Sequence, residues 1–410
     1  MNNLFTITQE LNKCINCKKP ACVDACPINN NIPSIVNALK IGDSTLASNL
    51  LSKSVLSDVC ARVCYGYCME ACNMAKLGKG PNIRGIEKFI FDNYSFNIPS
   101  NITPNGKTTA VIGSGPSGLA YAYHMAINGY KVTVYEKEEY LGGLLRYAIP
   151  FFILDEDTID KCISRLKNVG VEFKTNCFVD ANKLSELTKS YDYIYLALGA
   201  NKQVIPQIQN IMSSSSLDSN TFLLEFNKSK NFALYEGKNI IVLGGGNVAM
   251  DVAKCAKFAK AKNVTICYRR TICDMPAKLS EINEVLSEKI KILELSNPVS
   301  LNYEGSALKT ITCEKMISGP IGEDGRNTFI KTGEYFDIDA DLFIYAAGSY
   351  PDNSDYNSIL DNNRGKIIIN SSSQTSLSNI YAGGDLVRGP SSVTIAIADG
   401  INAAKSIINE

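Results

Sequence analysis

The 410-residue sequence is poor in histidine and has no net charge, since 41 basic residues balance 41 acidic ones. Its single histidine, His124, stands in the helical pattern LAYAYHMAINGY, where we expect a packed side chain rather than a catalyst. A mechanism built on histidine is therefore not expected. The zero net charge and the lack of a long basic block argue against nucleic acid or an anionic membrane as a partner.

Two targeting signals are also missing from the sequence. The first residues, MNNLFTITQE, lack the charged start and the apolar run of a signal peptide. No uninterrupted apolar stretch approaches the roughly 20 residues that span a bilayer. We therefore expect a soluble cytoplasmic protein, long enough for two or three domains.

Cysteine, in contrast, is abundant and unevenly placed. Eight of the 14 cysteines fall within the first 72 residues. Crowded cysteines in a cytosolic chain bind metal more often than they form disulfides. The other six form no CxxC pair, and we expect each to be a small buried hydrophobic residue: Cys162, Cys177, Cys255, Cys267, Cys273 and Cys313.

The second group of these cysteines has a regular spacing that poses a geometric problem. The stretch VCARVCYGYCMEAC places Cys60, Cys64, Cys68 and Cys72 at steps of four residues. On a straight helix these thiols would form a stripe about 18 Å long. No compact cluster could collect all four from such a rod. Either the segment bends, or one ligand comes from elsewhere and one thiol is spare.

After residue 107 the pattern changes to short β-branched strands that alternate with helices. NIPSNITPNGK, residues 97–107, is typical of a linker, and the serine run 213–216 predicts a flexible loop. The segments TAVIGSGPSGLAYAYHMAINGYKVTVYEK and KNIIVLGGGNVAMDVAKCAKFAKAKNVTICYRR each indicate strand, glycine turn, helix and strand. Two such units suggest two nucleotide-binding domains.

The first unit has the features of a dinucleotide site. Gly113, Gly115 and Gly118 form a GxGxxG turn directly after a strand. Such a turn lets backbone amides and a helix N-terminus approach a pyrophosphate. Glu136 ends the next strand, where an acidic side chain can bind ribose hydroxyls. The alternative, a tight turn without a ligand, does not account for the complete pattern.

The second unit differs at the end of its second strand. Gly244, Gly246 and Ala249 form the turn, but Arg269 and Arg270 stand where the first unit has an acid. Because guanidinium groups bind phosphate bidentately, this pair favours the 2′-phosphate of NADP(H) over NAD(H). The alternative is that both arginines are solvated surface charges.

The motifs VIGSGPSGLA, YEKEEYLGGLLRYAIP, GGGNVAMD and YAGGDLVRG resemble the two-dinucleotide flavoproteins. More narrowly, the whole chain resembles the small subunit of glutamate synthase and the N-terminal half of dihydropyrimidine dehydrogenase. The resemblance implies an α/β fold with a helical iron–sulfur domain followed by two Rossmann-like domains. The expected domains are residues 1–100 for the iron–sulfur part, 104–230 with 341–410 for FAD, and 231–340 for NAD(P)H.

In this family the first unit binds FAD, the second binds NAD(P)H, and the GGD turn at Gly383 closes over the flavin. The resemblance therefore implies the following cofactor-binding residues: Gly113, Ser114, Gly115, Pro116, Ser117, Gly118, Glu136, Lys137, Gly143, Leu144, Gly244, Gly245, Gly246, Asn247, Val248, Arg269, Arg270, Gly348, Gly384, Asp385 and Thr394. The disulfide reductases of this fold carry a cysteine pair beside the flavin, and this chain has none there. A stand-alone disulfide or quinone reductase is accordingly not expected.

The run CINCKKPACVDACP is similar to the cysteine run of bacterial ferredoxins, whose last cysteine binds the other cluster. By that logic Cys14, Cys17 and Cys22 hold a first cluster, and Cys26 crosses over to a second. The related dehydrogenase implies that Cys64, Cys68 and Cys72 join Cys26, which leaves Cys60 spare. It also implies Glu87 as the missing ligand of the first cluster. Two alternatives stay open: Cys60 in place of Glu87, and zinc, although only Cys14 and Cys17 form a C-x2-C knuckle.

Together the parts predict an oxidoreductase that carries electrons from NADPH through FAD to two [4Fe–4S] clusters. No substrate domain follows in the sequence, so we expect a partner that resembles the large subunit of glutamate synthase or the FMN subunit of dihydropyrimidine dehydrogenase, or a ferredoxin. The alternatives are an NAD(P)H-dependent dihydropyrimidine dehydrogenase small subunit and, from a different class, a zinc-stabilised nucleotide sensor.

Overall fold

The computed structural model describes residues 4–95, 98–99, 101–200, 202–211 and 215–409. The chain divides into two compact units. The first contains residues 1–146, 151–201 and 350–410, and the second contains residues 147–150 and 202–349. No helix of the described residues is long and apolar enough to cross a membrane.

The N-terminal part of the first unit is helical. Its elements are α1 (Leu4–Asn12), α2 (Ala21–Asp24), α3 (Ile32–Lys40), α4 (Ser44–Leu51), α5 (Ser57–Val63), α6 (Tyr67–Glu70), η1 (Ala75–Leu77) and α7 (Ile83–Asn93). Asn31, Asp43 and Asn82 begin α3, α4 and α7, because each side chain accepts a hydrogen bond from a free amide of the first turn. Apolar residues at helical spacing, such as Ile32, Ile35 and Val36 in α3, form the core of this part.

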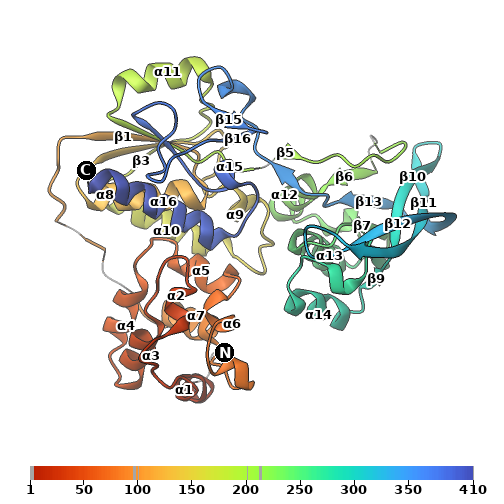
Figure 1. Ribbon diagram of the computed structural model, residues 1–410, viewed down its shortest axis with the longest axis horizontal. Helices are drawn as coiled ribbons and strands as arrows, with labels where there is room; N and C mark the ends of the chain where they lie inside the picture. Colours follow the sequence, from red (N-terminus) through yellow and green to blue (C-terminus); the bar gives the residue numbers. More distant parts are fainter. Residues whose placement is uncertain (1–3, 96–97, 100, 201, 212–214, 410) are drawn as a thin grey trace. The chain divides into compact units, whose positions relative to one another are not determined.

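The rest of the first unit is built on a parallel sheet with the strand order β17-β4-β1-β2-β3. The strands are β1 (Thr108–Ile112), β2 (Lys131–Tyr135), β3 (Glu172–Lys174), β4 (Tyr193–Leu196) and β17 (Ile380–Ala382). Thr108 to Ile112 lie opposite Lys131 to Tyr135, so both strands end at the same edge of the sheet. α8 (Pro116–Ile127) follows β1, and α16 (Val393–Ile408) packs along α8 (Figure 1).

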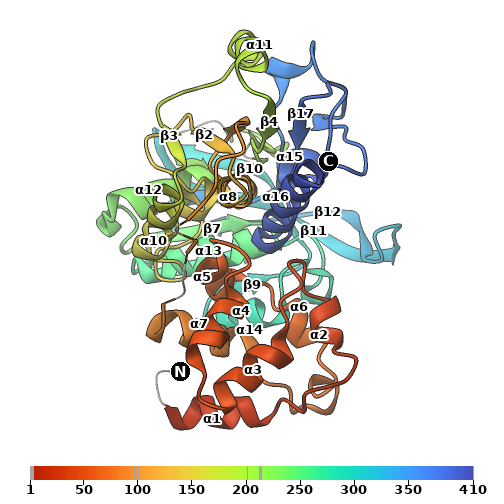
Figure 2. The ribbon, with the colours of Figure 1, turned by 90° about the vertical axis from the view of Figure 1, so that its left-hand side faces the viewer.

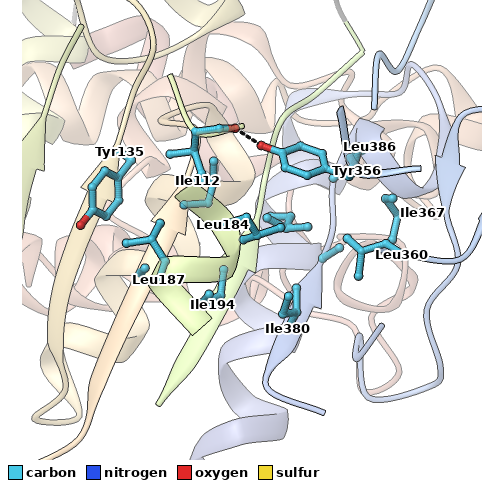
Figure 3. Packing of buried hydrophobic residues seen from close by; sticks show 14 residues of the cluster. Ile112, Tyr135, Leu184, Leu187, Ile194, Tyr356, Leu360, Ile367, Ile380 and Leu386 are labelled. Atoms are coloured by element: carbon cyan, nitrogen blue, oxygen red, sulfur yellow. Dashed lines mark hydrogen bonds between the residues drawn. The ribbon is translucent and has the colours of Figure 1, made fainter. Parts of the chain in front are cut away.

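The other face of this sheet is covered by α11 (Ala181–Ser190) and by residues 356–369 (Figure 3). Leu184 and Leu187 of α11 pack with Ile194 and Ile380 of the strands. The hydroxyl of Tyr356 donates a hydrogen bond to the carbonyl oxygen of Val179. The remaining elements of the unit are α10 (Glu156–Asn168), η4 (Ser354–Tyr356), β15 (Asn362–Asn363), β16 (Lys366–Ile367) and α15 (Asp385–Arg388). α9 (Leu144–Tyr147) begins in the first unit and ends in the second.

The second unit repeats the parallel arrangement with the strand order β6-β13-β7-β8-β9. These strands are β6 (Ser216–Asp218), β7 (Asn239–Leu243), β8 (Asn263–Cys267), β9 (Lys291–Leu293) and β13 (Leu342–Tyr345). The helices are α12 (Ser219–Ser229), η2 (Phe232–Leu234), α13 (Asn247–Phe258), η3 (Ile272–Asp274) and α14 (Leu279–Ser287). An antiparallel sheet is formed by β10 (Ser296–Glu304), β11 (Ala307–Ile321) and β12 (Asn327–Asp339), and a short ladder by β5 (Lys202–Gln203) and β14 (Ser349–Tyr350).

The strand pairing changes two expectations from the sequence. Residues 202–230 and β13 were expected in the FAD domain, but β6 and β13 pair in the second sheet, where Leu342 lies opposite Ile240. The serine run is not all loop, because Ser216 begins β6. Ser213 and Ser214 lie outside the described residues, as do residues 96–97 and 100 in and beside the expected linker.

Candidate functional site

The first glycine turn of the first unit has the geometry of a dinucleotide site. Gly113 has φ +100°, and a Cβ atom there would lie 2.5 Å from the carbonyl oxygen of Ala197, so only glycine fits. Gly115 begins α8 and has open space around its Cα. No side chain caps the first turn of this helix among the described residues. Its free amides can therefore receive a pyrophosphate.

Glu136 ties this turn to the end of β2. Its carboxylate is buried and accepts hydrogen bonds from the amide and the hydroxyl of Ser114, at 2.9 and 2.5 Å. The amide of Gly142 donates to the same hydroxyl at 3.1 Å. A Cβ atom on Gly143 would lie 3.1 Å from the Cα of Gly115, so the loop of Gly142 and Gly143 lies against the first turn. The acid expected to meet a ribose thus also holds the two glycine loops together.

The other residues implied for this site lie in the same part of the unit. Pro116 and Ser117 open α8, and the hydroxyls of Ser117 and Tyr195 are 2.7 Å apart. Gly118 lies within α8, and a Cβ atom there would meet the carbonyl oxygen of Gly113 at 2.1 Å. Lys137 is exposed and lies near Glu138, and Leu144 begins α9.

The GGD turn approaches the first turn from the end of β17. A Cβ atom on Gly384 would lie 3.0 Å from the Cβ of Ser117. The amide of Gly384 donates to Asp399 at 3.0 Å, and burial raises the pKa of Asp385 to about 6. Asp385 begins α15, and the role of the GGD turn in closing over a flavin stays a prediction.

Thr394, in the first turn of α16, carries an unsatisfied polar atom. Its hydroxyl is 1% exposed and has no hydrogen-bond partner among the described residues. The thiol of Cys60 lies near it, but the pair does not reach hydrogen-bond geometry. Leaving a hydroxyl buried and unpaired costs about 1–3 kcal/mol. A polar ligand beside this helix would remove that cost, so the residues present fit a bound flavin.

The second unit repeats the open turn. Gly246 begins α13, again with no side-chain cap among the described residues, and Gly244 has φ +144°. The ring of Tyr268 packs on Gly245, where a Cβ atom would lie 2.4 Å from it. Asn247 accepts a hydrogen bond from the amide of Lys278 at 2.9 Å. Val248 is exposed, and Gly348, after β13, has φ +103°.

The two arginines after β8 are held differently. Both guanidinium groups lie over the ring of Phe329, at 4.6 Å for Arg269 and 5.6 Å for Arg270. Arg270 is also 3.5 Å from a carboxylate oxygen of Asp324, and its Nε is buried without a hydrogen-bond partner in the described chain. Arg269 is exposed, and burial of part of its side chain lowers its pKa. The pair is therefore one exposed cation beside one that is partly neutralised.

The regularly spaced cysteines do not lie on one rod. α5 ends at Val63, and Gly66 begins α6 with φ +78°, so the segment bends between Cys64 and Cys68. The amide of Gly66 donates to the sulfur of Cys64 at 3.4 Å. The four cysteines spaced four residues apart therefore do not form one straight stripe, because the segment bends.

The bend brings Cys72 to the three cysteines at the start of the chain. Burial, and after it the nearby thiols of Cys72, Cys14 and Cys17, raise the pKa of Cys22 to about 11. The side chain of Asn73 donates to the sulfur of Cys17 at 3.8 Å. We call these four the outer group: Cys14, Cys17, Cys22 and Cys72.

A second set of donors gathers around Glu87. Burial raises the pKa of Cys68, as do the nearby Glu87, Cys64 and Cys26 and, least of these, Cys22 of the outer group. Cys60 is fully enclosed and has the same neighbours, so its pKa is also raised, first by burial. We call this set the inner group: Cys26, Cys60, Cys64, Cys68 and Glu87. The expected grouping placed Glu87 with Cys14, Cys17 and Cys22, and Cys72 with Cys26, Cys64 and Cys68. In the structure Glu87 lies near Cys26 and Cys68, and Cys72 lies near Cys22.

Glu87 is not a surface helix residue. It is 8% exposed, and burial raises its pKa to about 7. The side-chain amide nitrogen of Asn30 donates to it at 3.4 Å, while the side-chain oxygen of Asn30, Oδ1, is buried without a partner in the described residues. A buried carboxylate held by one weak hydrogen bond has free lone pairs, as a metal ligand needs.

Among the described residues, no three His, Cys, Asp or Glu side chains are close enough to hold one metal ion. In a [4Fe–4S] cluster each ligand binds a different iron atom, so the ligands stand farther apart than around zinc. All 14 cysteines are free thiols, and the eight near the N-terminus form the two groups.

The inner group lies against the flavin-binding part of the first unit, where α5 packs on α10 and α16 (Figure 2). The hydroxyl of Tyr67, between Cys64 and Cys68, donates to the hydroxyl of Ser392 at 3.0 Å. Ser392 begins α16. Arg165 of α10 makes an ion pair with buried Asp58 of α5 at 2.7 Å. Sequence reasoning missed Asn30, Tyr67 and Ser392, which belong to no motif.

The sequence predicted that the six remaining cysteines are buried and that the histidine is packed, and the structure agrees for most of them. Cys162, Cys255, Cys267 and Cys313 are buried. Cys273 is exposed and Cys177 is half-buried, so the expectation for these two was wrong. The ring of His124 lies 2.9 Å from the carbonyl oxygen of Lys53, and burial lowers its pKa to about 4.

Two family models match the chain. Residues 107–400 match the pyridine nucleotide-disulphide oxidoreductase model. Residues 3–97 match the model of dihydropyrimidine dehydrogenase domain II, 4Fe-4S cluster. Together they cover the two nucleotide turns and both cysteine groups.

Several curated relatives align with nearly the whole chain. The chain is 30% identical to the glutamate synthase [NADPH] small chain of Escherichia coli, over 98% of this chain and 90% of that protein. It is 26% identical to the NAD-dependent dihydropyrimidine dehydrogenase subunit PreT of Salmonella typhimurium, over 97% and 93%. It is 30% identical to the NADP(+)-dependent formate dehydrogenase subunit beta of Moorella thermoacetica, but spans only 59% of it.

Solved structures agree on the fold. Mycobacterium tuberculosis FprA in complex with NADPH has a TM-score of 0.63 at 18% identity, over 74% of this chain and 84% of that one. The thioredoxin reductase of T. acidophilum has a TM-score of 0.57 at 18% identity, over 74% and 98%.

Proposed function

Because the chain belongs to the pyridine nucleotide-disulphide oxidoreductases, with a 4Fe-4S domain at its N-terminal end, we propose that it passes electrons from NADPH to a protein partner. It is an NAD(P)H-dependent FAD oxidoreductase with iron–sulfur clusters. FAD, when bound, exchanges hydride with nicotinamide and single electrons with clusters. The partner is a catalytic subunit like that of glutamate synthase, or a ferredoxin. The names of several relatives designate subunits, which supports a partner.

The observation that carries this proposal is the position of the inner group. Tyr67 links the turn between Cys64 and Cys68 to Ser392, at the start of α16. The unpaired hydroxyl of Thr394 lies in the same turn, next to Cys60. The inner ligands and the helix expected at the flavin are thus joined by direct contacts.

We assign the ligands from the two groups. The outer group supplies four thiolates for one cluster. In the inner group Cys26, Cys64, Cys68 and Glu87 hold the other, and Cys60 is the alternative to Glu87. An oxygen ligand changes the charge and hence the potential of a cluster. The inner group therefore gives its cluster a potential different from that of the outer one.

The nucleotide residues have distinct roles in this proposal. Gly115 and the first turn of α8 receive the pyrophosphate of FAD, Glu136 binds its ribose, and Thr394 donates to its ring system. Gly246 and the first turn of α13 receive the pyrophosphate of NADPH. Arg269 binds the 2′-phosphate, because Arg270 is already paired with Asp324.

We propose a glutamate synthase-like partner before a dihydropyrimidine dehydrogenase-like one. The exposed Arg269 suits NADPH, and the relative named as a dihydropyrimidine dehydrogenase subunit is NAD-dependent by its name. The cytoplasmic location stays a prediction. The zinc-stabilised sensor is disfavoured by the match to a 4Fe-4S family model.

Metal analysis and rapid kinetics on anaerobically purified protein test the proposal. We expect iron and sulfide in near-equal amounts, flavin bleaching on mixing with NADPH, and then paramagnetic resonance signals from reduced clusters. Copurification under the same conditions identifies the partner. Zinc without sulfide, or a flavin that NADPH does not bleach, would refute the proposed function.

A further inference from the structure

The outer group differs from the inner group in its access to the surface. All four outer cysteines are half-buried, whereas Cys26, Cys60 and Cys68 of the inner group are buried. Cys64 is the one half-buried thiol of the inner group, so the outer group as a whole has the shorter path to solvent for electrons that leave the protein. The segments next to these cysteines are residues 14–19 and 73–79.

Two large apolar side chains stand exposed in these segments. Ile15 lies between Cys14 and Cys17 and is 60% exposed, and Leu77 of η1 is 69% exposed. The hydrogen bond from Asn73 to the sulfur of Cys17 joins the two segments. Burying such side chains costs nothing in polar desolvation and favours association by about 25 cal/mol per Å². Both therefore suit the centre of a protein contact.

The same two segments carry four lysines: Lys18, Lys19, Lys76 and Lys79. All four are exposed, and none has a carboxylate within ion-pair distance in the described chain. Lys13 is paired with Glu10 at 2.7 Å, and the exposed carboxylates of the two adjoining helices are Asp24 and Glu70. The surface is therefore positive, although the whole chain has no net charge.

We propose that Ile15, Leu77 and these four lysines form a docking surface, the exit surface, for an acidic electron-acceptor protein. The inference rests on the proposed function and adds the place and the charge of the partner. Complementary charge speeds the encounter of the two proteins and orients the partner. Close apolar contact at Ile15 and Leu77 would bring the redox centres of the two proteins nearer to each other. An acceptor with carboxylates around its own redox centre fits this surface.

The test uses the holoprotein and an acidic [2Fe–2S] ferredoxin as the probe, with basic cytochrome c as the charge control. The variant Lys18→Gln/Lys76→Gln/Lys79→Gln removes three charges of the exit surface. Lys167→Gln/Lys189→Gln/Lys262→Gln removes three exposed lysines from other parts of the chain and is the matched control. Binding of ferredoxin is measured by calorimetry, and its reduction by NADPH is measured at low and high salt.

We expect the exit-surface variant to bind and reduce ferredoxin about tenfold more weakly at low salt, with a smaller difference at high salt. Its iron content and its flavin bleaching by NADPH should be unchanged, and the control variant should behave like the unmodified protein. Ile15→Ser/Leu77→Ser should weaken binding at both salt concentrations, since apolar contacts are not screened.

Equal binding by the exit-surface and control variants would overturn the proposal, as would a preference of the unmodified protein for cytochrome c. Both results leave the proposed function intact, because NADPH would still bleach the flavin and reduce the clusters. Failure of that bleaching in the unmodified protein would instead refute the proposed function, and with it the exit surface.

Discussion

The outer and inner groups have similar donors but different surroundings. The outer group has four half-buried thiols beside exposed Ile15 and Leu77. The inner group includes a buried carboxylate and a surplus thiol, and it touches the start of α16 through Tyr67. Under the proposed function, burial and ligand chemistry, rather than spacing in the sequence, separate the cluster nearer the flavin from the cluster nearer the partner.

The largest expected effect comes from removing one cysteine of each group. Cys72→Ser should remove the same paramagnetic resonance signal as Cys17→Ser, because both belong to the outer group. Cys68→Ser should remove the other signal, and each variant should lose about half of the iron, since every iron atom of a cluster depends on the whole assembly. Iron per FAD and the spectra of the three variants measure this. If Cys72→Ser instead matched Cys68→Ser, the original grouping from the sequence would be restored.

A smaller effect separates Glu87 from Cys60 within the inner group. Glu87→Ala should leave one iron atom without its ligand, so that this iron is lost on mild oxidation, while Cys60→Ser should keep the full iron content. Glu87→Cys should retain the iron but shift the potential of the inner cluster, because thiolate replaces a harder oxygen donor. Iron analysis and a redox titration followed by paramagnetic resonance measure the two effects.

The opposite pattern would assign the ligand differently. Full iron in Glu87→Ala and loss of iron in Cys60→Ser would make Cys60 the ligand and Glu87 a buried neighbour. Ser48→Ala is a control for folding, because Ser48 is also buried in the N-terminal part but lies in neither group.

The comparison extends to the two arginines of the second unit. Arg269→Ala should raise the KM for NADPH by about 10- to 100-fold, because a charge-assisted hydrogen bond contributes about 1.5–3 kcal/mol. The KM for NADH should change little. Arg270→Ala should have the weaker effect on NADPH, since its guanidinium is already paired with Asp324. Steady-state kinetics with both nucleotides measure this, and equal KM values for NADPH in the two variants would contradict the unequal roles.

The sequence predicted what depends on local pattern and missed what depends on long-range contacts. The glycine turns at Gly113 and Gly244 were found because each requires a positive φ or a close backbone approach. The nearness of Cys72 to Cys22 and of Glu87 to Cys26 was not predicted, because it depends on the turn of the chain at Gly66 and on contacts between distant residues. β13 was expected in the FAD domain but pairs with β7 in the second unit, because the sequence of an isolated buried strand does not reveal its partner strand.

The smallest expected effect tests the contact between the inner group and the flavin-binding part. Tyr67→Phe removes the hydroxyl that donates to Ser392 and leaves the ring in place. A neutral hydrogen bond contributes about 0.5–1.5 kcal/mol, so electron transfer between flavin and inner cluster should slow by a few-fold at most. Iron content and the rate of flavin bleaching by NADPH should not change, because neither depends on this contact.

Tyr94→Phe removes a hydroxyl from another tyrosine of the N-terminal part and is the matched control. Stopped-flow absorbance resolves flavin bleaching from cluster reduction in each variant. Slower cluster reduction in Tyr67→Phe alone would support a path through the turn between Cys64 and Cys68. An equal rate in both variants would mean that packing of α5 on α10 and α16, rather than this hydrogen bond, sets the distance between the two cofactors.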